Sequence, residues 1–178
     1  CNASTTSLED ISKIDGLWHW MQIYFYRNRD YVKKLVERCK EANYDTIVVT
    51  TDSAIFGNRE WDRRNYSRPL VLTMRNKLHV LTKPRWLNDV LIPDGIPQFK
   101  NLGDLLPPGE TSVKGAAAVL GQQLDPSLNW DDIRWLRDEW KGRLVIKGIL
   151  SVEEAATAVE VGVDGIVLSN HGGRQLDY

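Results

Sequence analysis

The sequence predicts an α/β fold built around a parallel sheet, and two observations lead to this prediction. Four short segments are nearly continuous runs of apolar, β-branched or aromatic residues, which is typical of strands buried on both faces. Helical patterns lie between them, so that strand, helix and strand follow one another twice. Because such units pair their strands in parallel with the helices outside, the fold is either a barrel or an open doubly wound sheet.

The first of these units runs from residue 16 to residue 52. Its predicted strands are Gly16–Tyr24 (GLWHWMQIY) and Tyr44–Asp52 (YDTIVVTTD). The segment 29–42 between them has apolar residues at spacings of three and four, which predicts a helix with one buried stripe. The stripe consists of Val32, Leu35, Val36 and Cys39.

The second unit runs from residue 143 to residue 170. Arg143–Gly148 and Asp164–Asn170 are the predicted strands. The helix between them has clear end signals: Ser151 and Glu154 form a capping box, and Gly162 stands just past the last turn. The short connections complete a βαβ unit.

Residues 53–142 are too many for one crossover. Asn129 is a plausible N-cap for a helix that reaches Trp140, but residues 66–115 predict a long irregular insertion. The insertion region contains most of the prolines and a group of basic residues with apolar neighbours. Two interpretations remain open for it, an ordinary solvated loop and a surface that touches acidic lipid. The basic residues are Arg63, Arg64, Arg68, Arg75, Lys77, Lys83 and Arg85.

Composition limits the class of protein. The chain has 178 residues, 42% of them hydrophobic and 26% charged, with a net charge of -1, which indicates one globular domain and argues against nucleic-acid binding. Cys1 and Cys39 form no disulfide or metal-ligand pattern. No apolar run approaches the ~20 residues of a membrane span, and the first residues given lack the basic and apolar regions of a signal peptide. We therefore expect a location in the cytoplasm or on the inner face of a membrane. Because the sequence starts without methionine and stops at Tyr178, we expect an internal piece of a longer protein.

Each predicted strand ends on polar or ionisable residues. In parallel α/β folds ligands bind at the carboxyl ends of the strands, so these side chains are candidates for a site. A strand that leaves the core also turns polar, but that explanation accounts poorly for a lysine and a histidine. The residues are Gln22 and Tyr24, Thr50 and Asp52, Lys147, and Ser169 and His171.

The stretch SNHGGRQ carries the strongest chemical signal. His171 can give or take a proton near neutral pH, and Gly172 and Gly173 remove side chains that would crowd a ligand. Arg174 can hold a carboxylate through two parallel hydrogen bonds. Asp52 could orient the imidazole. Together they suggest a substrate with an acid group beside the bond that breaks.

Two further cations are candidates. Lys147, at the end of a buried strand, would stabilise negative charge that develops on a cofactor ring. Arg59 would supply a second anion contact, although a surface arrangement with Glu60 or Asp62 is equally available.

With these motifs the sequence resembles the family of FMN-dependent 2-hydroxy-acid oxidases and dehydrogenases. SNHGGRQLD is close to the family's signature, and MQIY, VTTD…GNRE and VIKG resemble three of its strand-end blocks, so that the likeness covers nearly the whole chain. The segment KPRWLNDVLIPDGIPQFKN looks most like the lactate and mandelate dehydrogenase branch.

The resemblance implies a (β/α)8 TIM barrel. The chain would supply about four central strands as a single partial FMN-binding domain, 1–178, with the insertion after its second strand. The strands that hold the flavin phosphate in the family are not among them.

By matched position, the resemblance also implies roles for individual residues. His171 would be the base and Asp52 its partner, Tyr24 would hydrogen-bond the substrate, and Arg174 and Arg59 would lie near its carboxylate. Ala3 stands where glycolate oxidases have a tryptophan, which leaves room for a larger 2-substituent. The implied FMN contacts are Gln22, Thr50, Lys147, Ser169 and Cys1, of which Cys1 replaces a serine found in many members.

The function implied is FMN-dependent oxidation of a lactate- or mandelate-like (S)-2-hydroxy acid to the 2-oxo acid. The electron acceptor is open between oxygen, quinone and cytochrome. For the full-length protein we expect a homotetramer, while peripheral membrane contact through the insertion stays open for the reason given above. Two alternatives remain: a barrel fragment that only binds or supports, and an FMN barrel enzyme with a phosphorylated substrate.

Overall fold

The computed structural model describes residues 1–53, 64, 66–68, 71–106, 116 and 120–175. Its main feature is a four-stranded parallel sheet with the order β1-β2-β5-β6. The strands are β1 (Trp20–Tyr24), β2 (Thr46–Thr50), β5 (Arg143–Ile149) and β6 (Gly165–Leu168). The four predicted strands are confirmed, but the burial expected for the last one is not, because Ile166, Val167 and Leu168 of β6 are exposed in this chain. Because the order follows the chain without reversing, the sheet has the form of successive barrel strands and not of a doubly wound sheet.

The register determines which side chains share a face. Gln22 lies opposite Val48, Tyr24 opposite Thr50, and Thr50 opposite Lys147. Because side chains alternate along a strand, these residues point to the same face, which corresponds to the inside of a barrel. The opposite face carries the buried apolar side chains Met21, Ile23, Ile47, Val49, Leu144 and Ile146.

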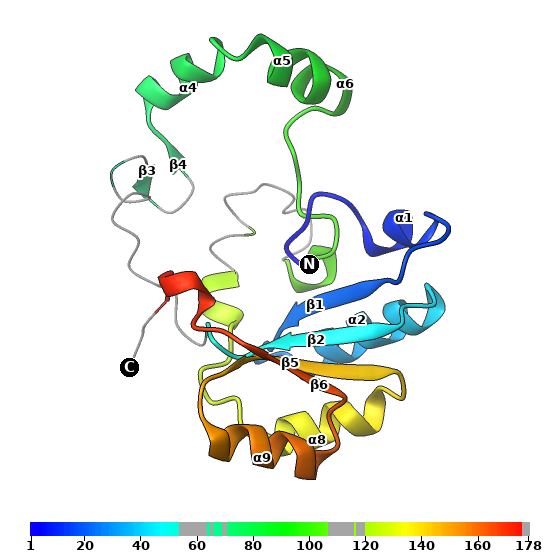
Figure 1. Ribbon diagram of the computed structural model, residues 1–178. Coiled ribbons are helices and arrows are strands. Elements are labelled where there is room, and N and C mark those ends of the chain that lie inside the picture. The colour runs from blue at the N-terminus through cyan, green and yellow to red at the C-terminus, as the bar shows by residue number, and fades with distance from the viewer. Residues whose placement is uncertain (54–63, 65, 69–70, 107–115, 117–119, 176–178) are drawn as a thin grey trace.

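Three helices pack against that apolar face (Figure 1): α2 (Arg29–Glu41), α8 (Trp130–Glu139) and α9 (Val152–Val161). All three are predicted from sequence, and their ends follow the predicted signals. Asn129 caps α8 in a capping box with Asp132, Ser151 and Glu154 cap α9, and Gly162 ends α9 in the left-handed conformation with φ 81°. A short helix, α1 (Leu8–Ser12), precedes the sheet and starts at the N-cap Ser7.

The insertion is more regular than the sequence indicates. An antiparallel pair, β3 (Tyr66–Arg68) and β4 (Val71–Leu72), leads to α4 (Met74–Val80), α5 (Pro84–Trp86), the π-helix η1 (Leu87–Leu91) and α6 (Ile92–Asp94). Thr73 caps α4 by accepting a hydrogen bond from Asn76 N, and Pro84 stands in the first turn of α5.

No residue of α4, α5, η1 or α6 is buried, and these helices lie apart from the sheet (Figure 1). The chain then returns through η2 (Gly103–Leu105), while residues 107–115 of the predicted insertion lie outside the described part. Within the described residues, no helix combines the length and apolar character needed to cross a membrane.

Candidate active site

The site is organised around Asp52, which follows β2 directly. Its Oδ2 accepts hydrogen bonds from Lys147 Nζ at 2.6 Å, from Ser169 Oγ at 2.6 Å and from His171 N at 3.0 Å. Its Oδ1 lies 2.6 Å from His171 Nδ1. The sheet therefore brings together residues from the ends of β2, β5 and β6, as the parallel topology predicts.

Asp52 is held in its charged form. Its side chain is 5% exposed, and this burial by itself raises the pKa of the carboxyl group. The hydrogen bonds from His171, Lys147 and Ser169 outweigh the burial, so that the pKa of Asp52 is below its ordinary value of 3.8. At neutral pH the site therefore contains a carboxylate between a lysine and a histidine.

His171 begins a left-handed turn after β6. His171, Gly172 and Gly173 have φ angles of 59°, 65° and 66°. Glycine adopts such angles without strain, whereas histidine does so at a cost. Side-chain hydrogen bonds from the preceding residues help to hold the turn: Ser169 Oγ accepts from His171 N at 3.0 Å, and Asn170 Oδ1 accepts from Gly173 N at 3.2 Å. The two glycines therefore set the direction of the chain as well as leaving space, a role that the sequence analysis does not predict.

A close backbone contact fixes Asp52 relative to Lys147. The carbonyl oxygen of Lys147 accepts from Thr51 N at 2.8 Å and from Thr51 Oγ1 at 3.1 Å. Gly148 has φ 121°, and a Cβ atom there would lie 2.5 Å from Thr51 Oγ1 and 2.7 Å from Asp52 N. Only glycine allows the two strand ends to approach in this way. Sequence reasoning missed Thr51 and Gly148, although a glycine near the end of a buried strand was a usable signal.

The ends of β1 and β2 add further polar groups. Gln22 Nε2 donates to Thr50 Oγ1 at 2.7 Å. Tyr24 and Thr50 line a pocket that extends to the loop 124–128, together with Ser53, which is buried. Within the described part, the buried Ser53 hydroxyl has no hydrogen-bond partner.

The remaining predicted site residues are Ala3, Cys1, Arg174 and Arg59. Ala3 is half-buried and packs against the core, and Cys1 is exposed. Arg174 is exposed and follows the His171 turn, where its backbone N donates to His171 O at 3.3 Å. Arg59 lies outside the described residues.

The geometry determines what His171 can do. Because a carboxylate only accepts hydrogen bonds, the contact with Asp52 places a proton on Nδ1 and leaves Nε2 to accept one. Once Nε2 is protonated, the nearby Asp52 stabilises the imidazolium. Lys147 Nζ, 3.4 Å from Nδ1, balances the charge of Asp52. The fold and site define a class: a β/α-barrel sheet with a hydrogen-bonded histidine–aspartate pair at its strand ends.

Comparison with known proteins identifies the family within that class. The family model for FMN-dependent dehydrogenases matches residues 1–178, so the chain belongs to this family.

Individual relatives agree with the assignment. An L-lactate dehydrogenase of Caulobacter sp. (strain K31) is 38% identical over 175 residues, which is 98% of this chain and 46% of that protein. The (S)-mandelate dehydrogenase of Pseudomonas putida is 38% identical over 176 residues, 98% of this chain and 44% of that protein.

Solved structures give the same result. The crystal structure described as the monotopic membrane protein (S)-mandelate dehydrogenase superposes with a TM-score of 0.85 at 37% identity. The match covers 99% of this chain and 46% of that one. A mandelate oxidase structure has a TM-score of 0.67 at 29% identity. The chain thus spans less than half the length of these relatives.

Proposed function

We propose that the protein containing this chain oxidises a lactate- or mandelate-like (S)-2-hydroxy acid to the 2-oxo acid with FMN. The observation that carries the proposal is the His171–Asp52 contact of 2.6 Å, next to a lysine, at the carboxyl edge of the sheet. The family membership and the lactate and mandelate dehydrogenases among the relatives support it.

The residues at this edge fit FMN by their chemistry. A flavin ring presents carbonyl and ring-nitrogen acceptors and one N–H donor along its polar edge. Amide, hydroxyl and ammonium groups on one face of the sheet match such an edge. We infer that the ring is held by Gln22, Thr50, Lys147 and Ser169, with Cys1 as a further contact.

The roles of the other residues follow from their chemistry. When bound, FMN supplies the two-electron acceptor that the oxidation requires. His171 Nε2 removes a proton from the substrate, and Asp52 stabilises the resulting imidazolium. Arg174 and Arg59 hold the substrate carboxylate, and Tyr24 hydrogen-bonds the substrate. The small Ala3 leaves room for a large 2-substituent, which favours lactate-like or aromatic acids over glycolate.

The proposal is tested by anaerobic bleaching of the flavin spectrum in the complete protein with L-lactate and (S)-mandelate. His171→Asn should keep FMN bound while the bleaching rate falls at least about 100-fold. His79→Asn changes an exposed histidine on α4 and serves as the matched control. A His171 variant that bleaches like the parent would refute the assigned role, and a parent that neither acid bleaches would refute the substrate class. A count of FMN per chain separates catalysis from the alternative of a purely structural barrel.

We also propose that the insertion contacts the surface of a membrane with acidic lipid. Met74, Leu78 and Leu81 recur at helical spacing along α4 and are more than half exposed. Ile92 and Ile96 extend the exposed apolar surface beyond η1. Basic side chains alternate with them, namely Arg75, Lys77, Lys83 and Arg85. An apolar stripe with flanking cations suits the interface of a bilayer, and one relative is described as a monotopic membrane protein.

Flotation with lipid vesicles tests this second proposal. The complete protein should float with vesicles that contain phosphatidylglycerol and bind less to pure phosphatidylcholine vesicles. The double variant Leu78→Asp/Leu81→Asp should abolish flotation, whereas Val159→Asp, at an exposed apolar position on α9, should not. Equal flotation of both variants would contradict the assignment of the insertion.

A further inference from the structure

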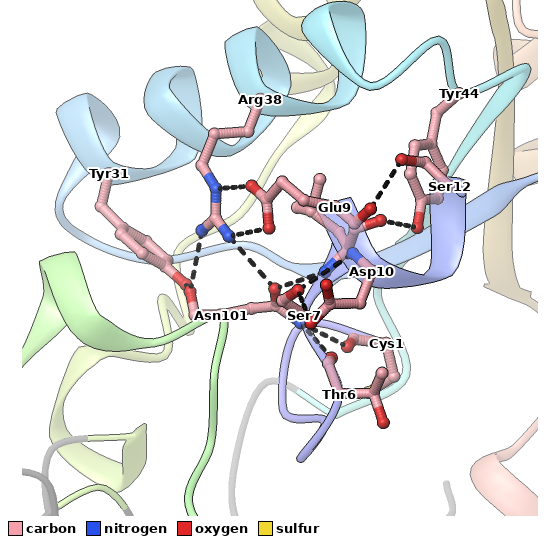
Figure 2. A network of polar contacts seen from close by, with 11 residues as sticks. Cys1, Thr6, Ser7, Glu9, Asp10, Ser12, Tyr31, Arg38, Tyr44 and Asn101 are labelled. Carbon is pink, nitrogen blue, oxygen red and sulfur yellow. Dashed lines mark hydrogen bonds and ion pairs between the residues drawn. The ribbon is translucent and has the colours of Figure 1, made fainter.

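Asn101 lies where the chain returns from the insertion, and both the donor and the acceptor of its side-chain amide make hydrogen bonds (Figure 2). The residue is 1% exposed. Oδ1 accepts from Leu8 N at 2.9 Å, while Nδ2 donates to Thr6 O at 3.2 Å and to Cys1 O at 3.5 Å. One side chain therefore binds the backbone of the N-terminal segment at three separate residues.

Helix α2 holds Asn101 from the opposite side (Figure 2). Tyr31 Oη donates to Asn101 O at 2.9 Å, and Arg38 Nη2 donates to Asn101 Oδ1 at 3.2 Å. Arg38 is itself fixed because it binds both carboxylate oxygens of Glu9 at 2.7 and 2.9 Å. Since α2 packs against the sheet, the position of Asn101 is tied to the core.

The segment that Asn101 holds is the one that carries Cys1 and Ala3. Backbone hydrogen bonds attach it on both sides: Asn2 N donates to Gln22 O at 3.0 Å, and Lys100 N donates to Ser4 O at 3.0 Å. The segment therefore runs beside β1 and beside the returning end of the insertion.

We propose that Asn101 is a positioning residue that sets the place of residues 1–6 beside the active site and thereby the selectivity for the substrate's 2-substituent. The inference about selectivity rests on the role proposed above for Ala3. Asn101 acts on that segment through its amide group and touches neither substrate nor cofactor. Through the same contacts, Asn101 connects the returning end of the insertion to residues 1–6.

An isosteric variant separates positioning from general support. Asn101→Asp keeps the acceptor that binds Leu8 N and Arg38, but it replaces the donor that faces the carbonyl oxygens of Thr6 and Cys1. Glu9→Gln weakens the partner of Arg38 without changing any group that binds residues 1–6, so it is the matched control.

Hydrogen exchange in the complete, flavin-loaded protein gives a readout that does not depend on activity. In Asn101→Asp the amides of residues 1–6 should exchange about tenfold faster, which corresponds to the loss of one or two buried hydrogen bonds. In Glu9→Gln their exchange should match that of the parent. Unchanged exchange in Asn101→Asp, or equal acceleration in both variants, would overturn the proposal.

Substrate selectivity gives the second readout. The ratio of kcat/KM for (S)-mandelate to that for glycolate should move about tenfold towards one in Asn101→Asp, mainly through KM, and stay within about twofold in Glu9→Gln. A lower Tm with an unchanged ratio would mean that Asn101 only supports the fold and would overturn the selectivity role. If no 2-hydroxy acid reduces the parent flavin, the proposed function fails, and the exchange experiment still decides whether Asn101 positions the segment.

Discussion

The carboxyl edge of the sheet and the insertion differ in what holds each in place. At the edge, Asp52 is almost fully buried and makes hydrogen bonds to three residues from neighbouring strand ends. In the insertion, α4, η1 and α6 bury no residue, and apolar side chains such as Leu78 face outward. One region is defined by contacts within the chain, whereas the other presents a surface that the described part of the chain does not cover.

The two proposed functions require different kinds of structure. Acid–base chemistry needs groups held within a few tenths of an ångström, and the residues proposed for it stand on strand ends that Thr51 and Gly148 help to fix. Contact with a soft, laterally uniform surface needs exposed apolar area and positive charge, but no fixed geometry. Variants in the two regions should therefore differ sharply in their effects.

The largest effect is expected from Asp52→Asn. The change removes the charge that stabilises protonated His171 and leaves Lys147 without its partner. We expect the rate of flavin reduction by (S)-mandelate to fall about 10²–10⁴-fold, with FMN still bound, in anaerobic stopped-flow measurements. A fall of less than about fivefold would show that His171 does not depend on Asp52.

Leu144→Ala should have the next largest effect. Leu144 is 0% exposed on the helix-covered face of β5, so the variant leaves a cavity in the core. The free energy of unfolding should decrease by about 2–5 kcal/mol, as measured by urea denaturation. A decrease below about 1 kcal/mol would contradict the close packing of the sheet against its helices.

Gly148→Ala tests the close contact between the strand ends. The new Cβ would lie 2.5 Å from Thr51 Oγ1, in a backbone conformation with φ 121°. We therefore expect the free energy of unfolding to decrease by about 1–3 kcal/mol and flavin reduction to become slower. Gly162→Ala is the matched control, because Gly162 also has positive φ but nothing lies within 4 Å of the added atom. Gly162→Ala should lower the free energy of unfolding by about 1 kcal/mol and leave the rate of flavin reduction unchanged. Equal rates in the two variants would refute the positioning role of Gly148.

The lowered pKa of Asp52 predicts a smaller effect on stability at acid pH. A carboxyl group whose folded-state pKa lies below its ordinary value stabilises the fold above that value and loses this contribution as the pH falls through the folded pKa. Stability should therefore decrease more steeply below pH 3.8 in the parent than in Asp52→Asn. Urea denaturation across this range measures both slopes, and parallel slopes would contradict the prediction.

The smallest effect is expected from Leu78→Ala in the insertion. Leu78 is 60% exposed on α4, so that the free energy of unfolding should change by less than about 0.5 kcal/mol without lipid. Binding to acidic vesicles should nevertheless weaken. A loss of stability comparable to that of Leu144→Ala would show that the insertion packs against another part of the protein.

Much of the fold could be predicted because its signals are local. Ser151, Glu154 and Gly162 mark the ends of α9 within one short segment, and the apolar runs of β2 and β5 leave little choice of structure. The helices of the insertion were missed because α4 carries an apolar stripe on an outward face, next to the short helical turns around Pro84 and Pro93. Apolar residues at helical spacing are a weak signal for a helix when no buried surface is expected to cover them and when prolines and charged residues surround them.

The sequence predicted which residues would gather at the strand ends, but it did not predict the hydrogen bonds between them. The polar strand ends and the SNHGGRQ turn identified Asp52, Lys147, Ser169 and His171. Asp52 accepts hydrogen bonds from the other three residues because of the register between strands that are distant in sequence and because of the bulge at Gly148. No local sequence pattern indicates either feature. The proposed role of Asn101 was missed for the same reason, because its partners Leu8 and Cys1 lie 93 and 100 residues away in sequence.

The topology of the sheet also has a consequence for folding. The pairs β1–β2 and β5–β6 are each closed by a single helix, so both units can form early and independently. Pairing Thr46 with Arg143 requires closure across the entire insertion. Each doubling of a loop costs only about 0.6 kcal/mol, but contacts of long range slow the search for the native state. The central β2–β5 seam should therefore be the last part of the sheet to form, and the Asp52–Lys147 contact that crosses it should appear only when folding is nearly complete.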